Sequence, residues 1–372
     1  MINPTRLLAM ARKEAVQLRR DAKSMMLAFL LPVVLLILFG YAITWDVNDI
    51  ATAVIDDDNS ARSRELIDAF RASGYFTIRE RPANASAIPA LLERNRAEIV
   101  LIFPPDFAAD LDAGRPARLQ AIIDGSDANA ATITIGYARA IVETYSARVR
   151  LGGMAMTPPL VVQSRVWYNE DLKSRNMIVP GLISVIMMII AAMLTSLTIA
   201  REWERGTMEQ LAATPVGRAE VILGKLLPYL AIGLIDLALA TLLGVLLFGV
   251  PLRGSLVLLV VLSFFFLVGS SGLGMFISAV ARSQLLAVQM SMMATFLPAY
   301  LLSGFMFAID VMPKPLQILS YAVPARYYLV VTRGIFLKGV GIDVLYIQGL
   351  LMVAFAVLGL FLAMRVFKKE LR

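Results

Sequence analysis

Residues 25–44 read M-M-L-A-F-L-L-P-V-V-L-L-I-L-F-G-Y-A-I-T, a stretch that contains no charged residue. At 1.5 Å of rise per residue, its 20 residues cover the roughly 30 Å hydrocarbon core of a bilayer. The stretch is too long for the apolar part of a secretory signal peptide, and no small-residue cleavage site follows it. The sequence therefore predicts a retained membrane-spanning helix at residues 25–45.

The composition extends this prediction to the whole chain. Of its 372 residues, 58% are hydrophobic and 17% are charged, whereas an ordinary soluble domain is about half apolar and about a quarter charged. The chain has no Cys and no His, which excludes thiol chemistry, disulfides, ordinary zinc ligation and an imidazole base. No nucleophile–base pair or metal-ligating cluster can be assembled, so we expect neither a catalytic site nor a metal site.

Five further apolar segments are long enough to cross a membrane as helices. They lie near residues 177–200, 222–249, 255–280, 285–307 and 343–364. Residues 171–372 are therefore expected to hold spans two to six.

Residues 46–170, between the first two predicted spans, are polar and charged, and strand-like patterns alternate with helix-like ones. Strands are predicted at residues 51–55, 75–78, 98–103 and 119–123, and helices at 60–72, 85–95 and 128–149. Such alternation is typical of a small α/β domain. A segment of about 125 residues can hold a core of its own.

The distribution of basic residues predicts the orientation of the chain. Residues 1–24, the 201–225 loop and the carboxyl-terminal tail carry more Lys and Arg than the short loops at the other ends of the spans. In a membrane protein such an excess marks the cytoplasmic side, so the net charge of +7 indicates orientation rather than nucleic-acid binding. The predicted fold is an α-helical polytopic membrane protein with six transmembrane helices, both termini in the cytoplasm, and an extracytoplasmic α/β domain inserted between spans one and two.

Residues 1–24 have the pattern of an amphipathic helix. Asn3 can cap a helix that has Pro4 at its first position. One face of this helix is apolar and is formed by Leu7, Ala11, Ala15 and Leu18. We expect the helix to lie along the cytoplasmic membrane surface; the alternative is a basic tail that only orients the first span.

Residues 308–341 are apolar but broken by Pro313, Pro315 and Pro324. They are too irregular to span the membrane. We expect them to enter the outer leaflet as short re-entrant helices, covered by protein or facing a water-filled cavity.

The polar segment Arg201–Glu220 follows a predicted span directly and reads R-E-W-E-R-G-T-M-E-Q-L-A-A-T-P-V-G-R-A-E. Charges are concentrated in Arg201–Arg205, after which Gly206-Thr207 can begin a short helix that Thr214-Pro215 ends. A short charged helix beneath a membrane bundle suits docking to a cytoplasmic partner. The alternative is a solvated loop whose charges only anchor the ends of the spans.

Two features inside the predicted spans could serve transport. Asp236 lies in the apolar segment Leu226–Val250, where a carboxylate is costly and is a functional candidate by default. It could bind a cationic substrate or carry a proton; the alternatives are a hydrogen bond to a neighbouring Ser or Thr, or a position nearer an interface. Four residues of the fifth span could form an adaptable apolar substrate wall or simply pack between helices: Met292, Met293, Phe296 and Tyr300.

The chain has no phosphate-binding loop of its own. Such a loop needs Gly, four residues and then Gly-Lys-Ser/Thr, and the nearest match, Gly217 to Gly224-Lys225, has the wrong spacing and is followed by Leu226. We therefore expect no ATP hydrolysis on this chain. Ser270, Gly274 and Ser278, at four-residue spacing, predict close packing of two helices in lipid.

The string R-E-W-E-R-G-T-M-E-Q-L at residues 201–211, followed by Thr214-Pro215 and Gly224-Lys225, resembles the cytoplasmic loop of type 2 ATP-binding-cassette (ABC) exporter permeases. The order of parts is also similar: an amphipathic helix, one span, a large outer domain and five more spans. The pattern L-S-G-F-M-F…M-P…P-A-R-Y-Y in Leu302–Tyr328 is similar to the bacterial multidrug-efflux branch of this family. The resemblance covers essentially the whole chain.

The resemblance implies partners and a mechanism. Two permease chains, identical or similar, would form a pathway for drug-like, lipid or other hydrophobic or cationic compounds through the bacterial inner membrane. Two ATP-binding subunits beneath them would hold ATP and magnesium, and a periplasmic adaptor protein would meet the outer domain. Closure of the ATP-binding subunits would push on the amino-terminal helix and on the loop residues Arg201, Glu202, Glu204, Arg205, Gly206, Thr207 and Pro215. Glu202 and Glu204 are expected to pair with basic residues of this helix pair or of the ATP-binding partner.

Two other functions compete with this one. An ion-coupled secondary transporter would use Asp236, although such proteins usually have paired halves or several buried charges. A membrane-anchored periplasmic sensor or assembly protein would use the α/β domain for binding, and would need no coupling loop and far fewer spans.

Overall fold

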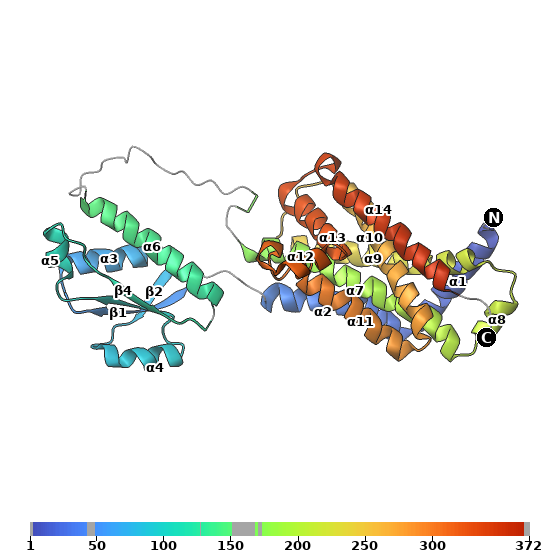
Figure 1. Ribbon diagram of the computed structural model, residues 1–372, viewed down its shortest axis with the longest axis horizontal. Coiled ribbons are helices and arrows are strands. Elements are labelled where there is room, and N and C mark those ends of the chain that lie inside the picture. Colours follow the sequence, from blue (N-terminus) through green and yellow to red (C-terminus); the bar gives the residue numbers. More distant parts are fainter. Residues whose placement is uncertain (1–2, 43–48, 127, 151–167, 170–172, 368–372) are drawn as a thin grey trace. The chain divides into compact units, whose positions relative to one another are not determined.

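The computed structural model describes residues 3–42, 49–126, 128–150, 168–169 and 173–367 (Figure 1). The chain divides into a helical unit, Met1–Thr44 with Val166–Arg372, and an α/β unit, Trp45–Arg165. Both predicted ends of the 46–170 domain lie outside the described residues, and so does the basic tail segment 368–372.

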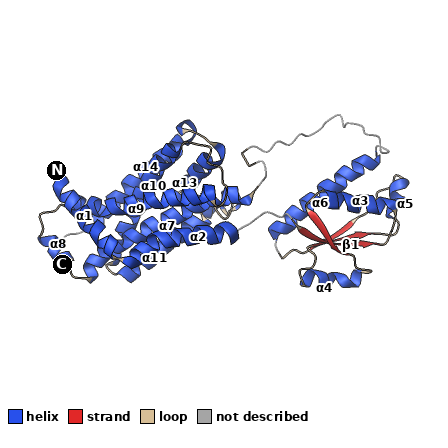
Figure 2. Cartoon of the chain, turned by 180° about the vertical axis from the view of Figure 1, so that it is seen from behind, coloured by secondary structure: helices blue, strands red, loops and turns tan. Residues whose placement is uncertain are grey.

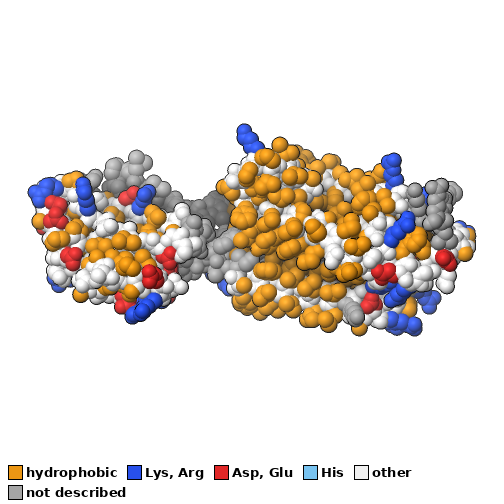
Figure 3. All heavy atoms as spheres, turned by 60° about the horizontal axis from the view of Figure 1, so that its bottom comes forward, with side chains coloured by type: hydrophobic (Ala, Val, Ile, Leu, Met, Phe, Trp, Pro, Cys, Tyr) orange, Lys and Arg blue, Asp and Glu red, His pale blue; other side chains and the backbone are white. Residues whose placement is uncertain are grey.

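Six long helices form the frame of the helical unit: α2 (Ala22–Ala42), α7 (Ser174–Glu204), α9 (Arg218–Leu246), α10 (Leu256–Ala281), α11 (Gln284–Leu301) and α14 (Ile342–Val366). Within the described residues, these six are long and apolar enough to cross a membrane, by length and composition. α7 is the central helix, because 94% of its most apolar window is buried in the unit, against 22% for both α2 and α11. Hydrophobic side chains cover the outer surface of this unit in the view of Figure 3, and charged side chains gather at the end that holds α1 (Pro4–Arg20) and α8 (Met208–Ala213).

Small residues let α10 pack closely against two helices. A Cβ atom at Gly274 would lie 2.2 Å from the carbonyl oxygen of Ala192 in α7, and one at Gly359 in α14 would lie 2.7 Å from the carbonyl oxygen of Gly269 in α10. The hydroxyl of Ser278 accepts hydrogen bonds from the backbone N–H groups of residues 199 and 200 in α7. The predicted packing role of this small-residue face is therefore confirmed.

The fifth long helix ends earlier than the sequence predicts. α11 stops at Leu301, whereas the apolar segment was expected to span residues 285–307. Gly304 adopts a φ of +87°, a left-handed conformation that a helix cannot contain. Hydropathy does not register this change, because Phe305 and the residues after it are as apolar as the helix itself.

Short helices fill the segment that follows. They are η2 (Ile309–Val311), α12 (Lys314–Ser320), α13 (Pro324–Arg333) and the π-helical turn η3 (Gly334–Lys338). α13 packs against α7, α10 and α14, and the stacked rings of Tyr328 and Phe266, with centroids 4.0 Å apart, hold it to α10. Residues 308–341 are thus broken helices, of which α13 and η3 pack on the bundle while η2 and α12 are largely exposed.

The α/β unit is a four-stranded sheet with helices on both faces. Its strands are β1 (Ile50–Asp56), β2 (Phe76–Glu80), β3 (Ile99–Phe103) and β4 (Gln120–Ile123), in the order β2-β1-β3-β4, with only β4 antiparallel to its neighbour. Figures 1 and 2 show α4 (Ile88–Glu93) on one face, and α3 (Ala61–Ala72) and α6 (Ala128–Arg150) on the other. Each strand lies where the sequence predicts it, and Ser60 caps α3 through a hydrogen bond from the N–H of Ser63 at 3.0 Å.

Candidate coupling site

The amino-terminal helix α1 packs against the bundle rather than resting only on a surface. Its buried residues are Met10, Glu14 and Leu18, which recur at helical spacing on one face. Gly224 of α9 allows the close contact, since a Cβ atom there would lie 2.7 Å from the Cβ of Met10. The buried face is rotated from the predicted apolar face, because Ala15 is exposed while Glu14 is buried.

Three buried charged residues join α1, α7 and α9. The ammonium of Lys225 lies 2.7 Å from Glu14 Oε2 and 3.0 Å from Glu202 Oε1, and the three side chains are 1%, 1% and 3% exposed. Tyr229 donates a hydrogen bond of 3.1 Å to the other oxygen of Glu14. At the edge of this group, the half-exposed Lys13 lies 2.8 Å from Glu202. We call Glu14, Lys225 and Glu202 the buried charge cluster.

The burial of these three charges restricts how the helices that carry them can move. Charges removed from water are tolerated when each has a partner in good geometry, and loss of one partner leaves an uncompensated buried charge. Each member of the cluster belongs to a different helix. The relative positions of α1, α7 and α9 are therefore tied to one another at this end of the bundle.

Arg201, in the last turns of α7, makes a second buried connection. Its guanidinium lies 2.8 Å from Asp21 Oδ2, at the junction of α1 and α2, and donates to the hydroxyl of Ser24 in α2 at 3.1 Å. It also donates to the side chain of Gln284, the first residue of α11, at 3.3 Å. The backbone N–H of Gln284 in turn donates to Glu204 at 2.7 Å. Arg201 thus links the central helix to α2 and α11.

The turn between α7 and α8 is fixed by local geometry. Gly206 has a φ of +67°, which reverses the chain directly after α7. The hydroxyl of Thr207 donates to the carboxylate of Glu202, so the start of α8 is attached to the buried charge cluster. After α8, the carbonyl of Pro215 accepts a hydrogen bond of 2.6 Å from Arg6 of α1.

Glu220, in the first turn of α9, accepts hydrogen bonds from two backbone N–H groups. One carboxylate oxygen accepts from the backbone N–H of Gly217, and the other accepts from the backbone N–H of Asn3, both at 2.7 Å. Asn3 also caps α1, as predicted, by accepting from the N–H of Thr5 at 3.0 Å. The amino-terminal end of α1 is therefore attached to the start of α9 and the loop before it.

The predicted coupling residues divide into two groups. Arg201 and Glu202 are buried, so their side chains face the interior of the bundle and not the surface. Glu202 pairs with Lys13 and Lys225, as expected, whereas the partner of Glu204 is the amide residue Gln284. The exposed members of the predicted set are Glu204, Arg205, Gly206 and Pro215, with Thr207 half-buried between them.

Sequence reasoning missed four residues of this site: Glu14, Asp21, Lys225 and Tyr229. Two signals pointed to them. Glu14 is the only acidic residue among the many basic ones of segment 1–20, and Lys225 stands between Gly224 and Leu226 at the start of a long apolar segment. Neither signal predicts that Glu14 and Lys225 form a pair.

Asp236 is 1% exposed in the interior of α9. Neither carboxylate oxygen has a hydrogen-bond partner among the described residues, so the predicted alternative of a Ser or Thr partner does not hold there. The side chain of Thr241, one and a half turns further along the same helix, is also buried and unpartnered in the described part of the chain. A carboxylate in this environment lacks the compensation that buried charges usually have.

The predicted substrate wall is not on the interior face of this chain. Met292 and Met293 are 50% and 69% exposed, and the buried face of α11 consists of Ala287, Ser291, Thr295 and Ala299. Phe296 and Tyr300 are half-buried and stack on each other, with centroids 5.6 Å apart. α11 packs on α7, α10 and α13, and α9 packs on α1, α2, α7, α10 and α14.

Comparison with known proteins links this architecture to transporters. Residues 23–365 match the family described as ABC-2 family transporter protein. The chain is 36% identical to the probable multidrug ABC transporter permease YbhS of Escherichia coli K12, over 95% of this chain and 94% of YbhS. It is 30% identical to the probable multidrug ABC transporter permease YbhR of the same organism, over 92% of each chain. A more distant relative is the inner membrane transport permease YhhJ of Escherichia coli K12, at 26% identity over 81% of this chain and 80% of YhhJ.

Proposed function

Because the chain belongs to the ABC-2 transporter family, we propose that it is a permease subunit which exports a drug-like, lipid or other hydrophobic or cationic compound, driven by ATP hydrolysis on a separate ATP-binding subunit. The chain is a multi-pass membrane protein of the kind its permease relatives represent. ATP and magnesium belong to the partner in this proposal. The permease contributes the pathway and the surface on which the partner acts.

The proposed topology has six spans, with both termini in the cytoplasm of a bacterial cell and the α/β unit outside the inner membrane. It is supported by the six long apolar helices and by the concentration of basic residues in segments 1–24 and 201–225. In this topology α1, α8 and the buried charge cluster lie at the cytoplasmic ends of α7 and α9.

The observation that carries the coupling proposal is the buried charge cluster. It ties α1 and α9 to α7, the most buried helix of the unit, through contacts of 2.7–3.0 Å. The hydroxyl of Thr207 ties the α8 turn to the carboxylate of Glu202 in the same cluster. A displacement applied to the exposed residues Glu204, Arg205 and Pro215 would therefore move α7 as well as the loop. Nucleotide-driven closure of the partner can shift the permease only if it binds one arrangement of this end better than the other.

We further propose that a second permease chain, identical or similar, completes the pathway. The outer faces of α2, α11 and α14 support this, since most of each apolar window is not buried within one chain. Met292 and Met293 lie on such a face, where flexible apolar side chains can pack against a substrate or a second chain. A periplasmic adaptor that contacts the α/β unit belongs to the same proposal.

A second candidate function, ion-coupled secondary transport, rests on one observation. Asp236 is a buried carboxylate with no partner in the described part of the chain, which suits a site that takes up a cation or a proton. In the exporter, the same residue is proposed to lie on the substrate pathway.

The first experiment is affinity purification of the chain from its own cell membranes in mild detergent, with mass spectrometry of the proteins that accompany it. We expect an ATP-binding subunit in stoichiometric amount, and its loss from the Arg205→Glu variant. The reproducible absence of that subunit, with the chain intact and folded, would contradict the exporter and favour ion-coupled transport through Asp236.

A further inference from the structure

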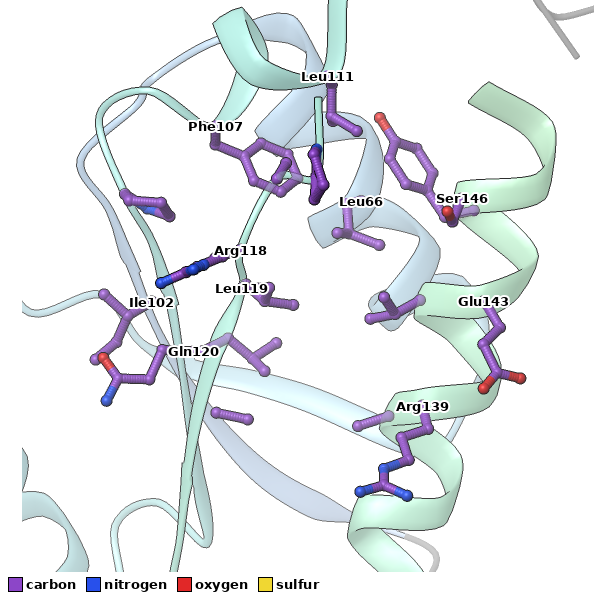
Figure 4. Close-up of a pocket in the computed structure, with 18 of the residues that line it drawn as sticks. Leu66, Ile102, Phe107, Leu111, Arg118, Leu119, Gln120, Arg139, Glu143 and Ser146 are labelled. Atoms are coloured by element: carbon purple, nitrogen blue, oxygen red, sulfur yellow. The ribbon is translucent and has the colours of Figure 1, made fainter. Parts of the chain in front are cut away.

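Asp236 differs from every other buried charged residue in the described part of the chain. Its side chain is 1% exposed, and neither carboxylate oxygen has a hydrogen-bond partner among the described residues. The other buried charged residues all have such partners: Glu14, Arg201, Glu202, Glu220 and Lys225. In the α/β unit, the charged residues that line the cavity between α3, α6 and the sheet, such as Arg118 and Glu143, are exposed (Figure 4).

No charge from the middle of the long helices can pair with Asp236. Six helical segments contain no Asp, Glu, Lys or Arg apart from Asp236 itself: 25–42, 176–200, 226–246, 256–281, 285–301 and 344–364. Within the described residues, the interior at the level of Asp236 is therefore without compensating charge.

The helices that pack against α9 are α1, α2, α7, α10 and α14. α10 has no charged or titratable residue, and α1 lies beside the first turns of α9, where its Glu14 pairs with Lys225. The other three helices carry such residues within about two turns of an end. These residues are Lys23, Tyr41, Arg175, Arg201, Glu202, Glu204, Asp343, Tyr346 and Arg365.

Glu14 shows what a buried carboxylate needs in order to remain ionised. Its side chain is also 1% exposed, but one oxygen lies 2.7 Å from the ammonium of Lys225 and the other accepts a hydrogen bond of 3.1 Å from Tyr229. Asp236 has no comparable contact in the described structure. Burial of an isolated carboxylate costs far more than burial of a neutral carboxyl group, so an acid in this position takes up a proton.

The burial of Asp236 also limits which cation it can hold. Neither oxygen is accessible to water in the described structure, and a hydrated metal ion or an organic ammonium group is at least as large as a water molecule. A bare metal ion would need several further oxygen ligands, which no described side chain supplies by a hydrogen bond to Asp236. A proton needs no free volume and no further ligand.

Asp236 shares one face of α9 with two residues of the coupling site. Lys225, Tyr229 and Asp236 follow one another at intervals of four and seven residues, which places all three on the same side of the helix, and all are buried. Pro228 lies between Lys225 and Asp236 and has no N–H for the carbonyl of Gly224, so α9 can bend there. A displacement of the coupling end can therefore change the surroundings of Asp236.

We propose that Asp236 is a proton-binding site, neutral in the described conformation, which releases its proton to water when the transport cycle opens this part of the bundle. Only the O–H bond breaks: the proton passes to water, and the carboxylate takes up a proton again before it is buried. The neutral carboxyl group depends on burial alone, whereas its release rests on the exporter proposed above. Because the closed conformation binds the proton and the open one does not, a rise in pH favours opening.

The first test is infrared spectroscopy of the full-length chain at neutral pH in dodecyl maltoside, a detergent without a carbonyl group. A neutral carboxyl group has a C=O band above the amide I band, whereas ionised carboxylates absorb below it. We expect this band in the wild type, and we expect it to shift when the aspartate carboxyl carbons are labelled with carbon-13. The labelling identifies a neutral aspartic acid without any substitution.

Substitutions assign the band to one residue. Asp236→Asn and Asp236→Leu are both expected to lose it, so the assignment holds if either variant folds. The matched control is Asp343→Asn, since Asp343 is exposed in the first turn of α14 and its substitution should leave the band in place. The absence of the band from the wild type, or its persistence in a folded Asp236 variant, would overturn the proposal.

The second test addresses proton release in the complex with the ATP-binding subunit. Partner-stimulated ATP hydrolysis is measured at several pH values for the wild type and for Asp236→Asn, which resembles the neutral acid but cannot lose a proton. We expect the ratio of the wild-type rate to the variant rate to fall as the pH rises, because the wild type must take up a proton in order to close. A ratio that is constant with pH would refute proton release. If no ATP-binding subunit accompanies the chain, the exporter is contradicted, and the infrared band still decides whether Asp236 holds a proton.

Discussion

The carboxylate of Glu14 and the ammonium of Lys225 lie 2.7 Å apart, with both side chains 1% exposed, although 211 residues separate them in the sequence. Such a pair is not in itself a source of stability, because the desolvation of two charges offsets much of their attraction. Its effect lies in what happens when one partner is removed. It makes the position of α1 conditional on the correct placement of α9.

Lys225→Met is expected to lower the free energy of unfolding by about 3–5 kcal/mol, because Glu14 and Glu202 then share a buried site without their common cation. Thermal unfolding in detergent, followed by tryptophan fluorescence, measures the effect. The control is Lys13→Met, since the Lys13 side chain is 47% exposed and Glu202 keeps Lys225 as its partner, so a loss of about 0–1 kcal/mol is expected. Equal losses in the two variants would show that the buried charge cluster has no special role.

Arg205→Glu is expected to reduce partner-stimulated ATP hydrolysis at least tenfold without changing thermal stability. Arg205 is exposed and has no ion-pair partner in the described part of the chain, so its removal leaves the fold intact. Arg253→Glu makes the same charge change in the loop between α9 and α10. This loop follows the carboxyl-terminal end of α9, whereas Arg205 precedes its amino-terminal end, so Arg253→Glu should leave hydrolysis unchanged. A full rate of hydrolysis with Arg205→Glu would remove this residue from the coupling surface.

Asp236→Leu is expected to stabilise the protein and impair its function. Replacing a buried, unsatisfied polar group removes a penalty of about 1–3 kcal/mol, while a site that binds a cation or proton is lost. Unfolding temperature and partner-stimulated ATP hydrolysis are measured on the same preparations. Thr241→Val serves as the control, because the hydroxyl of Thr241 is also buried and has no partner among the described residues, and it should leave hydrolysis unchanged. Full hydrolysis in Asp236→Leu would leave Asp236 with a packing role only.

Gly359→Ala is expected to destabilise the protein by about 1–3 kcal/mol, the usual cost of overpacking a core. The new methyl group would lie 2.7 Å from the carbonyl oxygen of Gly269, so α14 and α10 would have to separate. Gly136→Ala in α6 is the matched control, because no atom lies within 4 Å of the added methyl. That variant should gain about 0.5–1 kcal/mol from the better helix propensity of alanine. A loss of stability in both variants would contradict the packing argument.

The long elements of this fold are predictable because each depends on local composition. An uncharged run of about 20 residues predicts a spanning helix wherever it occurs. The helix α8 lies between its caps Thr207 and Thr214, as Gly206-Thr207 and Thr214-Pro215 predict. The end of α11 was not predictable in this way. It depends on the backbone conformation at Gly304, inside a segment whose hydropathy does not change.

The site was less predictable than the fold because its residues meet through tertiary packing. The rotation of α1 that buries Glu14 is set by the surface of α9, where Gly224 admits Met10, and no pattern within segment 1–24 contains that information. The position of Asp236 in the interior was predictable, since a lone carboxylate in an apolar segment has few alternatives. The exposure of Met292 and Met293 was not, because the buried face of α11 is made of small residues that hydropathy does not favour.

The attachment of Asn3 and Glu14 to Glu220 and Lys225 also constrains the order of assembly. α1 leaves the ribosome before α9, and the residues of α9 that hold it are synthesised more than 200 positions later. Until α9 has been inserted, Glu14 has only water or lipid headgroups as its surroundings, so α1 waits undocked throughout the synthesis of the α/β unit. α1 therefore reaches its native position late in biogenesis, after the α/β unit and α9 have been synthesised.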